Sequence, residues 1–285
     1  MATRPAALAR RWRLVAAAHL ALAPKVTSAV IVAAGAGDAE PPVPDPGVAR
    51  VAIVAGLSGV YLGKGWVLTA GHVLTAARNQ KKTEALIADR AYHLDPGSSI
   101  RLESSDGKAD LALVRIEGDP GLPPLAITTR TPPIGARLVL AGNGPLQESR
   151  RGCWDAVGKP VAEMRPGVRC GFAWRKTPEG KTNGVQWGTN QVAGSPSIFP
   201  GPEKTRTRVF PTSFRDGLPT PREAQAGVGD SGGPVFVETG AGYELAGILL
   251  GVSARSSGAA LFGDRTYAAD LSAYREQIED VLEHR

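Results

Sequence analysis

The stretch Gly227-Val-Gly-Asp-Ser-Gly-Gly-Pro-Val235 is the most informative part of this sequence of 285 residues. A serine hydroxyl is a poor nucleophile unless a base removes its proton and the anion that forms is stabilised. The glycines around Ser231 allow a tight backbone turn in which two N–H groups face a reacting carbonyl. A generic Gly-x-Ser-x-Gly pattern arises by chance in many turns, but here Asp230 precedes the serine and Pro234 opens a strand-like run. We therefore predict that Ser231 is a catalytic nucleophile.

Two other segments supply the residue types that a nucleophilic serine needs. Trp66-Val-Leu-Thr-Ala-Gly-His-Val-Leu74 places His72 directly after an apolar strand, and an imidazole titrates near neutral pH, as a general base must. Lys108-Ala-Asp-Leu-Ala-Leu-Val-Arg-Ile116 places Asp110 at the mouth of a second apolar strand, where a carboxylate would fix the imidazole tautomer. Taken singly, the histidine would be interpreted as a loop residue and the aspartate as a strand-end cap. The three segments together indicate a catalytic triad.

This set of segments resembles the trypsin/chymotrypsin family of serine proteases, which has the same order of His, Asp and Ser along the chain. Subtilisins and α/β-hydrolases use other orders. The resemblance implies a serine endopeptidase in which His72 is general base and then acid, Asp110 orients it, and Ser231 attacks. It also implies an oxyanion hole formed by the backbone N–H groups of Gly229 and Ser231.

The resemblance further implies an all-β fold of two packed antiparallel six-stranded β-barrels with a C-terminal helix. The 35 Gly and 23 Pro residues also favour many turns over long helices. We expect the first barrel to end near Pro120, the Pro-rich stretch 119–135 to be the crossover, and Ser272 to cap a helix over 272–285. Strands are expected at 48–54, 59–62, 66–69, 111–116, 137–141, 234–238 and 243–252.

The stretch from about Gly142 to Arg222 departs from the family pattern and looks enlarged, and few strands can be assigned in it. The family's usual disulfide network is absent, because the chain has only Cys153 and Cys170. In an oxidising compartment these two would form a disulfide, and the alternative is two unrelated buried thiols. The related high-temperature-requirement proteases fit less well, since they carry Asn before the serine and append peptide-binding domains.

Side-chain preference in this family depends on the residue six positions before the nucleophile, which here is Gln225. Trypsin-type enzymes carry Asp there, so we expect no preference for Lys or Arg. The strand 246–252 should form one pocket wall, with Gly251 and Val252 at its end, and Val252 stands where a wide pocket would have Gly. We place Arg265 close behind this wall. The alternative is a different alignment of the loops, which would make Gln225 a surface residue.

Many family members are activated when a freed N-terminus beginning Ile-Val inserts its ammonium beside the Asp that precedes the nucleophile. Asp230 occupies that place, and Ile31-Val-Ala-Ala34 lies 41 residues before His72. A cut between Val30 and Ile31 would create the amine. The alternative is that this apolar stretch is the tail of a leader or the start of a tether.

Residues 1–29 have the pattern of a signal peptide, with a basic start, a short apolar run and the small residues Thr27-Ser-Ala29. An uncleaved anchor is the alternative, although the run is short for a stable membrane span. We expect a Pro/Gly-rich tether at 30–47, a peptidase domain at 48–285, and a secreted or periplasmic location.

The net charge of +6 does not indicate a nucleic-acid partner. Residues 1–29 hold five of the 33 basic side chains and no acidic one, so the remainder carries 28 basic against 27 acidic side chains. We expect a protein or peptide substrate and neither metal nor organic cofactor. The alternatives are a catalytically dead relative that serves as a binding module and an esterase with the same triad.

Overall fold

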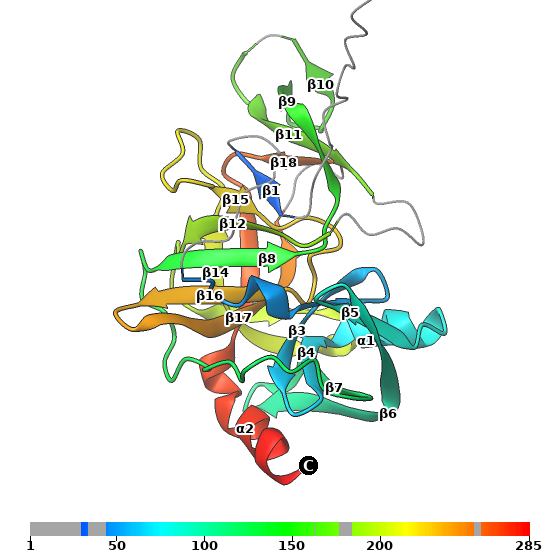
Figure 1. The fold of residues 1–285 in the computed structure, drawn as a ribbon. Coiled ribbons are helices and arrows are strands. Elements are labelled where there is room, and N and C mark those ends of the chain that lie inside the picture. The colour runs from blue at the N-terminus through cyan, green and yellow to red at the C-terminus, as the bar shows by residue number, and fades with distance from the viewer. Residues whose placement is uncertain (1–29, 34–43, 163, 177–183, 254–257) are drawn as a thin grey trace, which may run out of the picture.

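The first half of the chain forms a closed antiparallel barrel (Figure 1). The structure, a computed structural model, describes residues 30–33, 44–162, 164–176, 184–253 and 258–285, so the expected signal peptide and tether residues 34–43 lie outside it. The barrel strands, in order around it, are β2 (Val51–Val54), β3 (Leu57–Gly63), β4 (Trp66–Ala70), β7 (Gly107–Ile116), β6 (Arg90–Ser104) and β5 (Glu84–Ile87). β2 pairs with β5 and closes the ring.

Apolar side chains fix the register of this barrel. Val60, Leu68 and Leu113 lie opposite one another on β3, β4 and β7, and each is fully buried. A one-residue slip would turn such a set away from the core, so the register is strongly specified. The same register places Ala70, at the end of β4, opposite Leu111 on β7. The two strand ends expected to carry the triad base and acid therefore lie side by side.

The second half is a seven-stranded antiparallel sheet that curls into a second barrel (Figure 1). A bridge between Val192 and Thr212, with an Ala193 N–H to Pro211 carbonyl bond of 2.8 Å, joins the first strand to the sixth. The expected two-barrel fold is thus confirmed with one difference: the first barrel is closed, whereas the second sheet has seven strands and forms a half-barrel whose strands meet at this single bridge. Its strands in order are β12 (Gln186–Gln191), β8 (Arg137–Gly142), β16 (Pro234–Thr239), β17 (Gly242–Val252), β19 (Arg265–Asp270), β14 (Arg206–Ser213) and β13 (Ser197–Pro200).

The segment expected to be irregular, from Gly142 to Arg222, is instead rich in strands. Beyond β12, β13 and β14 it contributes three strands of a four-stranded sheet that projects from the second barrel (Figure 1), which we call the extension sheet. Its strands in order are β10 (Pro160–Val161), β9 (Leu146–Trp154), β11 (Arg169–Arg175) and β18 (Ala259–Leu261). These strands were not predicted because their sequences mix Arg, Gly and aromatic residues. Each strand therefore has too few buried apolar side chains to show the usual alternation of apolar and polar residues.

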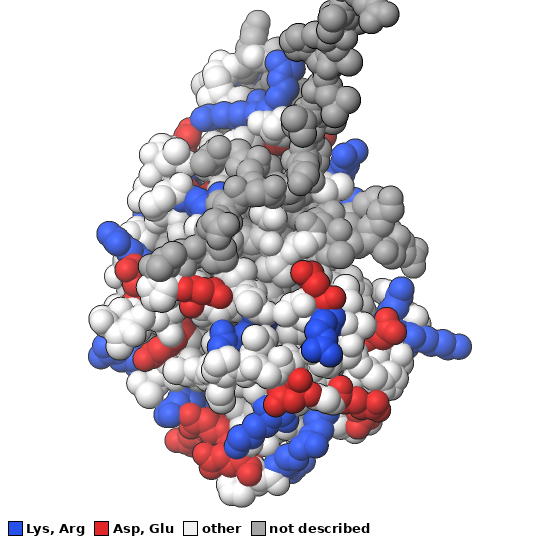
Figure 2. All heavy atoms as spheres, in the orientation of Figure 1, with Lys and Arg blue, Asp and Glu red and all other residues white. Residues whose placement is uncertain are grey.

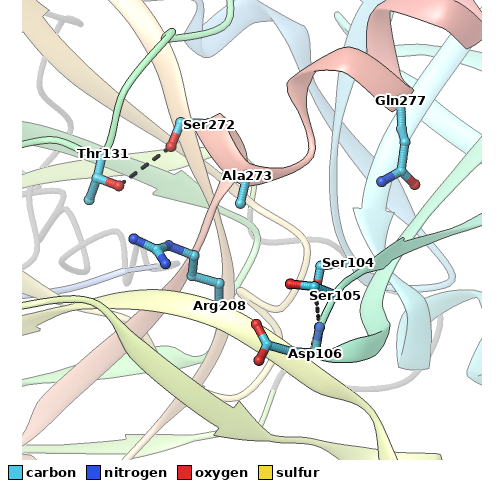
Figure 3. A pocket seen from close by; sticks show the side chains of 8 residues that line it. All are labelled: Ser104, Ser105, Asp106, Thr131, Arg208, Ser272, Ala273 and Gln277. Atoms are coloured by element: carbon cyan, nitrogen blue, oxygen red, sulfur yellow. Dashed lines mark hydrogen bonds between the residues drawn. The ribbon is translucent and has the colours of Figure 1, made fainter.

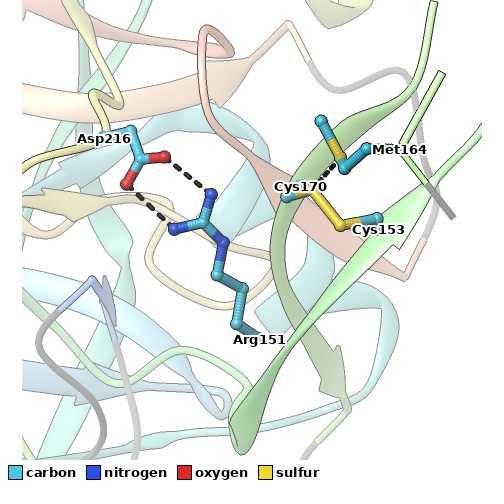
Figure 4. Close-up of a disulfide and its surroundings, with 5 residues drawn as sticks. All are labelled: Arg151, Cys153, Met164, Cys170 and Asp216. Carbon is cyan, nitrogen blue, oxygen red and sulfur yellow. Dashed lines mark hydrogen bonds and ion pairs between the residues drawn. A yellow bond between two sulfur atoms is a disulfide. The ribbon is translucent and has the colours of Figure 1, made fainter. Parts of the chain in front are cut away.

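The extension sheet is cross-linked and tied to the second barrel (Figure 4). Cys153 on β9 and Cys170 on β11 are directly opposite in register and form the expected disulfide. Arg151 binds Asp216, after β14, with two bonds of 3.1 and 2.6 Å, and this bidentate contact holds the pKa of Asp216 below its usual range. A disulfide that closes a loop of this size typically stabilises the folded state by about 3 kcal/mol.

The N-terminal segment is not a free tether where it is described. Ile31–Val32 forms β1, which pairs antiparallel with β15 (Ala224–Gln225). Ile31 is fully buried and Val32 is 3% exposed. Burying two large aliphatic side chains is favourable by a few kcal/mol, which an unattached tether would forgo.

Helices are few. α1 (Gly71–Asn79) follows β4, α2 (Arg275–His284) ends the chain, and three short 3-10 helices cover Val48–Arg50, Pro202–Lys204 and Leu271–Ala273. Ser272 does not cap the terminal helix. Asp270 accepts from the Ser272 backbone N–H and caps the last 3-10 helix, because the chain turns once more before α2 begins.

The described residues contain no helix of the length and apolarity that a membrane crossing requires. On the face seen in Figure 2, acidic and basic side chains are interspersed over the lower body.

Candidate active site

His72 and Asp110 are held together where β4 ends beside β7, and Asp110 lies within β7 because this strand begins at Gly107, before the expected start at Leu111. His72 lies in the first turn of α1, directly after β4, and Asp110 lies on β7. Nδ1 of His72 is 2.6 Å from Oδ2 of Asp110, and the His72 backbone N–H donates to Oδ1 at 2.8 Å. Asp110 is 2% exposed, whereas 27% of the His72 side chain is open to solvent. With Nδ1 engaged by the carboxylate, Nε2 is the ring nitrogen left to exchange a proton.

Asp110 is itself fixed by groups from other elements. Its backbone N–H donates to the Thr207 hydroxyl at 2.8 Å. Nη1 of Arg101 lies 3.9 Å from Oδ1 of Asp110, while Nη2 donates to Glu203 at 3.2 Å and to Thr75 at 3.1 Å. The Arg101 guanidinium therefore lies between the carboxylates of Asp110 and Glu203.

Ser231 lies in a tight turn between β15 and β16 that packs directly against the first barrel. The Ser58 backbone N–H donates to the Ser231 carbonyl at 3.0 Å, and the Ser58 hydroxyl donates to the Gly229 carbonyl at 3.0 Å. Ser58 is fully buried at the start of β3. A Cβ added to Gly232 would collide with the Ser58 carbonyl oxygen and the Thr69 hydroxyl of β4. The turn that contains Ser231 thus packs against β4, the strand that leads into α1 and His72.

The turn before Ser231 leaves two backbone donors unengaged. Gly229 has φ of +114°, in the left-handed region that other residues rarely adopt. Neither the Gly229 nor the Ser231 N–H donates a hydrogen bond to a residue in the described part of the chain. Two unengaged N–H groups set two residues apart, in a turn that is fixed elsewhere by Ser58, are the donors that an anion-binding turn would need.

Asp230, between these two residues, is fully buried. Its Oδ2 accepts from the Gly227 N–H at 2.7 Å, while Oδ1 has neither a hydrogen-bond partner nor a paired cation among the residues that the structure describes. Burial raises the pKa of Asp230 to about 7, against the lowering effect of backbone hydrogen bonds from Gly227 and Gly144. A Cβ on Gly142 or Gly144 would collide with the carboxylate, so the surrounding backbone is closed tightly over it. A buried acceptor of this kind calls for a donor, preferably a cation.

The raised pKa of Asp230 predicts how stability varies with pH in the uncut chain. The folded protein binds a proton at Asp230 more tightly than the unfolded chain does, so the stability contribution is full below about pH 4 and is lost as pH rises through about 7. We expect Asp230→Asn to raise the melting temperature by several degrees at pH 8 and to change it little at pH 4. Thermal melts at both pH values measure this, with Asp280→Asn on exposed α2 as the charge-matched control. Equal effects of Asp230→Asn at pH 4 and pH 8 would contradict it.

β1 lies next to this turn. Ile31 is opposite Gln225 in the pairing of β1 with β15, and a Cβ added to Gly227 would lie 3.2 Å from Cδ1 of Ile31. Gly227 in turn donates to Asp230. The expected activation partners Ile31 and Asp230 therefore both contact Gly227, Ile31 through its side chain and Asp230 through a hydrogen bond to the Gly227 N–H.

The expected pocket residues also come together through β19. Gln225 is 2% exposed, so it is not the surface residue of the alternative alignment, and its Oε1 has no hydrogen-bond partner within the described ranges. The N–H of the next residue donates to the Thr266 hydroxyl at 3.1 Å, and Thr266 pairs with Val252. Gly251 is opposite Tyr267 and packs against Phe199, which an added Cβ would approach to 3.1 Å. Arg265, expected close behind, is exposed because its position on β19 faces solvent.

Comparison with known proteins agrees with this geometry. A family profile described as a trypsin-like peptidase domain matches residues 57–248, more than half of the chain. The chain belongs to the trypsin-like peptidase family. No curated protein matches its sequence.

Two solved structures illustrate how distant its structural neighbours are. One is an inactive form of a serine mutant of Rv3671c from M. tuberculosis H37Rv, with 14% identity and a TM-score of 0.49 over 87% of this chain and 98% of that one. The other is neuropsin, a serine protease expressed in the limbic system of mouse brain, with 16% identity and a TM-score of 0.47 over 80% and 89% of the two chains.

Several residues around the site of this trypsin-like peptidase were not predicted from its sequence. Ser58 holds the nucleophile turn, Arg101 and Thr207 hold Asp110, and Gly71 makes room for Arg101, whose guanidinium would collide with a Cβ there. Each is distant in sequence from the residue it supports. In the sequence, only Gly71, directly before His72, lies next to a residue that was predicted to belong to the site.

A separate polar pocket of about 410 Å³ lies beside the start of the terminal helix (Figure 3). Arg208, Asp106 and Ser272 line it, and the Arg208 guanidinium binds the fully buried Asp270 at 3.2 Å. The triad residues do not line this pocket. Among the described residues, no group of three or more His, Cys, Asp or Glu side chains is placed to hold a metal ion.

Proposed function

We propose that this trypsin-like peptidase is a serine endopeptidase with His72, Asp110 and Ser231 as its triad. The observation that carries the proposal is the 2.6 Å contact between His72 Nδ1 and Asp110 Oδ2, beside a Ser231 turn with two unengaged N–H groups. A buried carboxylate on Nδ1 presents the histidine in the tautomer that accepts a proton at Nε2.

The proposed reaction passes through an acyl-enzyme. Ser231 Oγ attacks the scissile carbonyl while its proton moves to Nε2 of His72, and the N–H groups of Gly229 and Ser231 bind the oxyanion. The C–N bond breaks as His72 gives its proton to the leaving amine. Water then repeats the sequence on the ester, releasing the acid and restoring the Ser231 hydroxyl. The Thr207 bond and the nearby Arg101 guanidinium hold Asp110 in place throughout.

Fluorophosphonate labelling together with peptide turnover tests the proposal. A working triad reacts covalently at Ser231, and the Ser231→Ala protein does not. Labelling without peptide turnover but with ester turnover would favour an esterase. No labelling of the folded protein in the form that begins at Ile31 would favour a binding module that has lost catalysis.

We also propose that a cut between Val30 and Ile31 completes the site. The new Ile31 ammonium would supply the cation that Oδ1 of Asp230 lacks, and pairing two buried charges is favourable only when both are buried together. The pairing of Ile31 with Gln225 supports this placement. A location outside the cytoplasm, secreted or periplasmic, would follow from removal of residues 1–29, and it fits the disulfide of the extension sheet.

The pocket residue Gln225 predicts that cleavage does not favour Lys or Arg. It is uncharged and buried, so a cationic substrate side chain would lose several kcal/mol of hydration without a counter-ion. Val252 further narrows the wall at the end of β17. A peptide library should show higher kcat/KM after Leu, Ala or Gln than after Arg. Gln225→Asp is the matched test, since it should shift preference toward Arg and Lys. A strong Arg preference in the unmodified protein would contradict this prediction.

A further inference from the structure

The side-chain amide of Gln147 on β9 forms hydrogen bonds with both backbone polar groups of Val32, an arrangement that we call the clamp. Its Oε1 accepts from the Val32 N–H at 2.8 Å, and its Nε2 donates to the Val32 carbonyl at 2.8 Å. Gln147 is 2% exposed and Val32 is 3% exposed, and the two are 115 positions apart in the chain. The side-chain amide thus acts as a one-residue strand partner for β1, on the edge that β15 leaves free.

The inner face of the extension sheet covers the other residue of β1. Ile31 packs in one buried cluster with Phe172 of β11, Ala260 of β18 and Phe214 of the body. β1 therefore lies between the extension sheet and β15, as Figure 1 shows. The apolar contacts bind the Ile31 side chain, while Gln147 fixes the backbone of the residue that follows.

β1 leads directly to the nucleophile turn. Ile31 pairs with Gln225, its Cδ1 packs against Gly227, and the Gly227 N–H binds the buried Asp230 that precedes Ser231. Contacts that hold β1 in place therefore also restrain the turn that contains Ser231 and the two unengaged N–H groups.

We propose that the extension sheet is a receptor for the Ile31–Val32 strand and that Gln147 is the positioning residue that couples seating of this strand to the order of the nucleophile turn. The clamp acts on backbone groups of Val32, so it operates on this strand whether or not the bond before Ile31 is cut. The catalytic consequence rests on the proposed function, in which Ser231 is the nucleophile.

The test uses two variants of Gln147, with amide exchange measured on the full chain and peptide turnover measured on the form that begins at Ile31. Gln147→Met keeps the side-chain volume and removes both bonds, and Gln147→Glu keeps the acceptor for the Val32 N–H but sets an oxygen against its carbonyl. Loss of two buried neutral hydrogen bonds should raise the amide exchange rate of residues 31–33 by about 30-fold, with a smaller rise in residues 227–231. Ser149→Ala, an exposed neutral change on the same strand, is the control and should raise neither.

Two further readouts separate a positioning role from a structural one. Exchange within β9 and β11 should stay unchanged, since a role in the extension sheet itself would speed it there. Peptide turnover should lose kcat with little change in KM, because the clamp orders the turn and does not touch substrate.

Each outcome decides the proposal. Faster exchange confined to residues 31–33 and 227–231, with lower kcat, supports it. Unchanged exchange in residues 31–33, or faster exchange there with an unchanged turn and unchanged kcat, overturns it. If the unmodified form that begins at Ile31 neither labels nor hydrolyses peptides, the proposed function fails, and the exchange of the two segments alone then decides for or against the receptor.

Discussion

Replacing Ser231 with Ala is expected to lower kcat/KM for peptide hydrolysis by a factor on the order of 10⁴ or more, with the fold retained. The turn is held by backbone and by Ser58, whose bonds go to the carbonyls of Ser231 and Gly229 and not to the Ser231 hydroxyl. Removing the hydroxyl therefore removes the attacking atom without loosening the turn. Residual catalysis would come from the oxyanion hole and from substrate binding.

His72→Ala should cost a comparable factor, because triad members act as a unit. The double variant should then be no slower than either single one, whereas independent roles would multiply. Steady-state turnover of one peptide substrate by the three proteins measures this, with melting temperatures as the check on folding. Turnover by Ser231→Ala at the level of the unmodified protein, after contaminating peptidases are removed, would overturn the proposed mechanism.

The segments that hold His72 and Asp110 could be placed on strands from the sequence because each is a short local pattern. An apolar run followed by Thr-Ala-Gly-His marks where β4 ends, and Lys-Ala-Asp before an apolar run lies within β7. The order of the three segments indicated the family and, through it, the two-barrel type of fold. These predictions needed no knowledge of contacts distant in sequence.

The parts that were not predictable depend on contacts between distant segments. The extension sheet is stabilised by a disulfide, by the pairing of β11 with β18 and by packing on Ile31, none of which has a local pattern. β1 was expected partly as tether, because two residues carry too little periodicity to predict a strand. Ser58 and Gln147 are ordinary polar residues in sequence. Their roles appear only when the partner backbone is in place.

Asp230→Asn should have opposite consequences in the uncut and cut proteins. In the uncut chain the carboxylate is buried with an unpartnered Oδ1, so the neutral isostere should stabilise at high pH. In the cut chain the Ile31 ammonium would be the missing partner, and removing one member of a buried ion pair costs about 3–5 kcal/mol. We therefore expect Asp230→Asn to lower kcat/KM of the cut enzyme by about 10²-fold to 10³-fold.

The experiment compares two forms of each protein, one beginning at Ile31 and one extended at the N-terminus. The unmodified protein should be active only when it begins at Ile31, and N-terminal sequencing of the naturally produced active form should give that residue. Asp280→Asn, the same charge change on exposed α2, should leave both forms unaffected. The oxyanion hole depends on the turn around Gly229, so the loss should appear in kcat, with a smaller effect on KM. Full activity from a form that begins elsewhere, undiminished by Asp230→Asn, would show that the buried carboxylate orders the turn through its backbone hydrogen bonds alone.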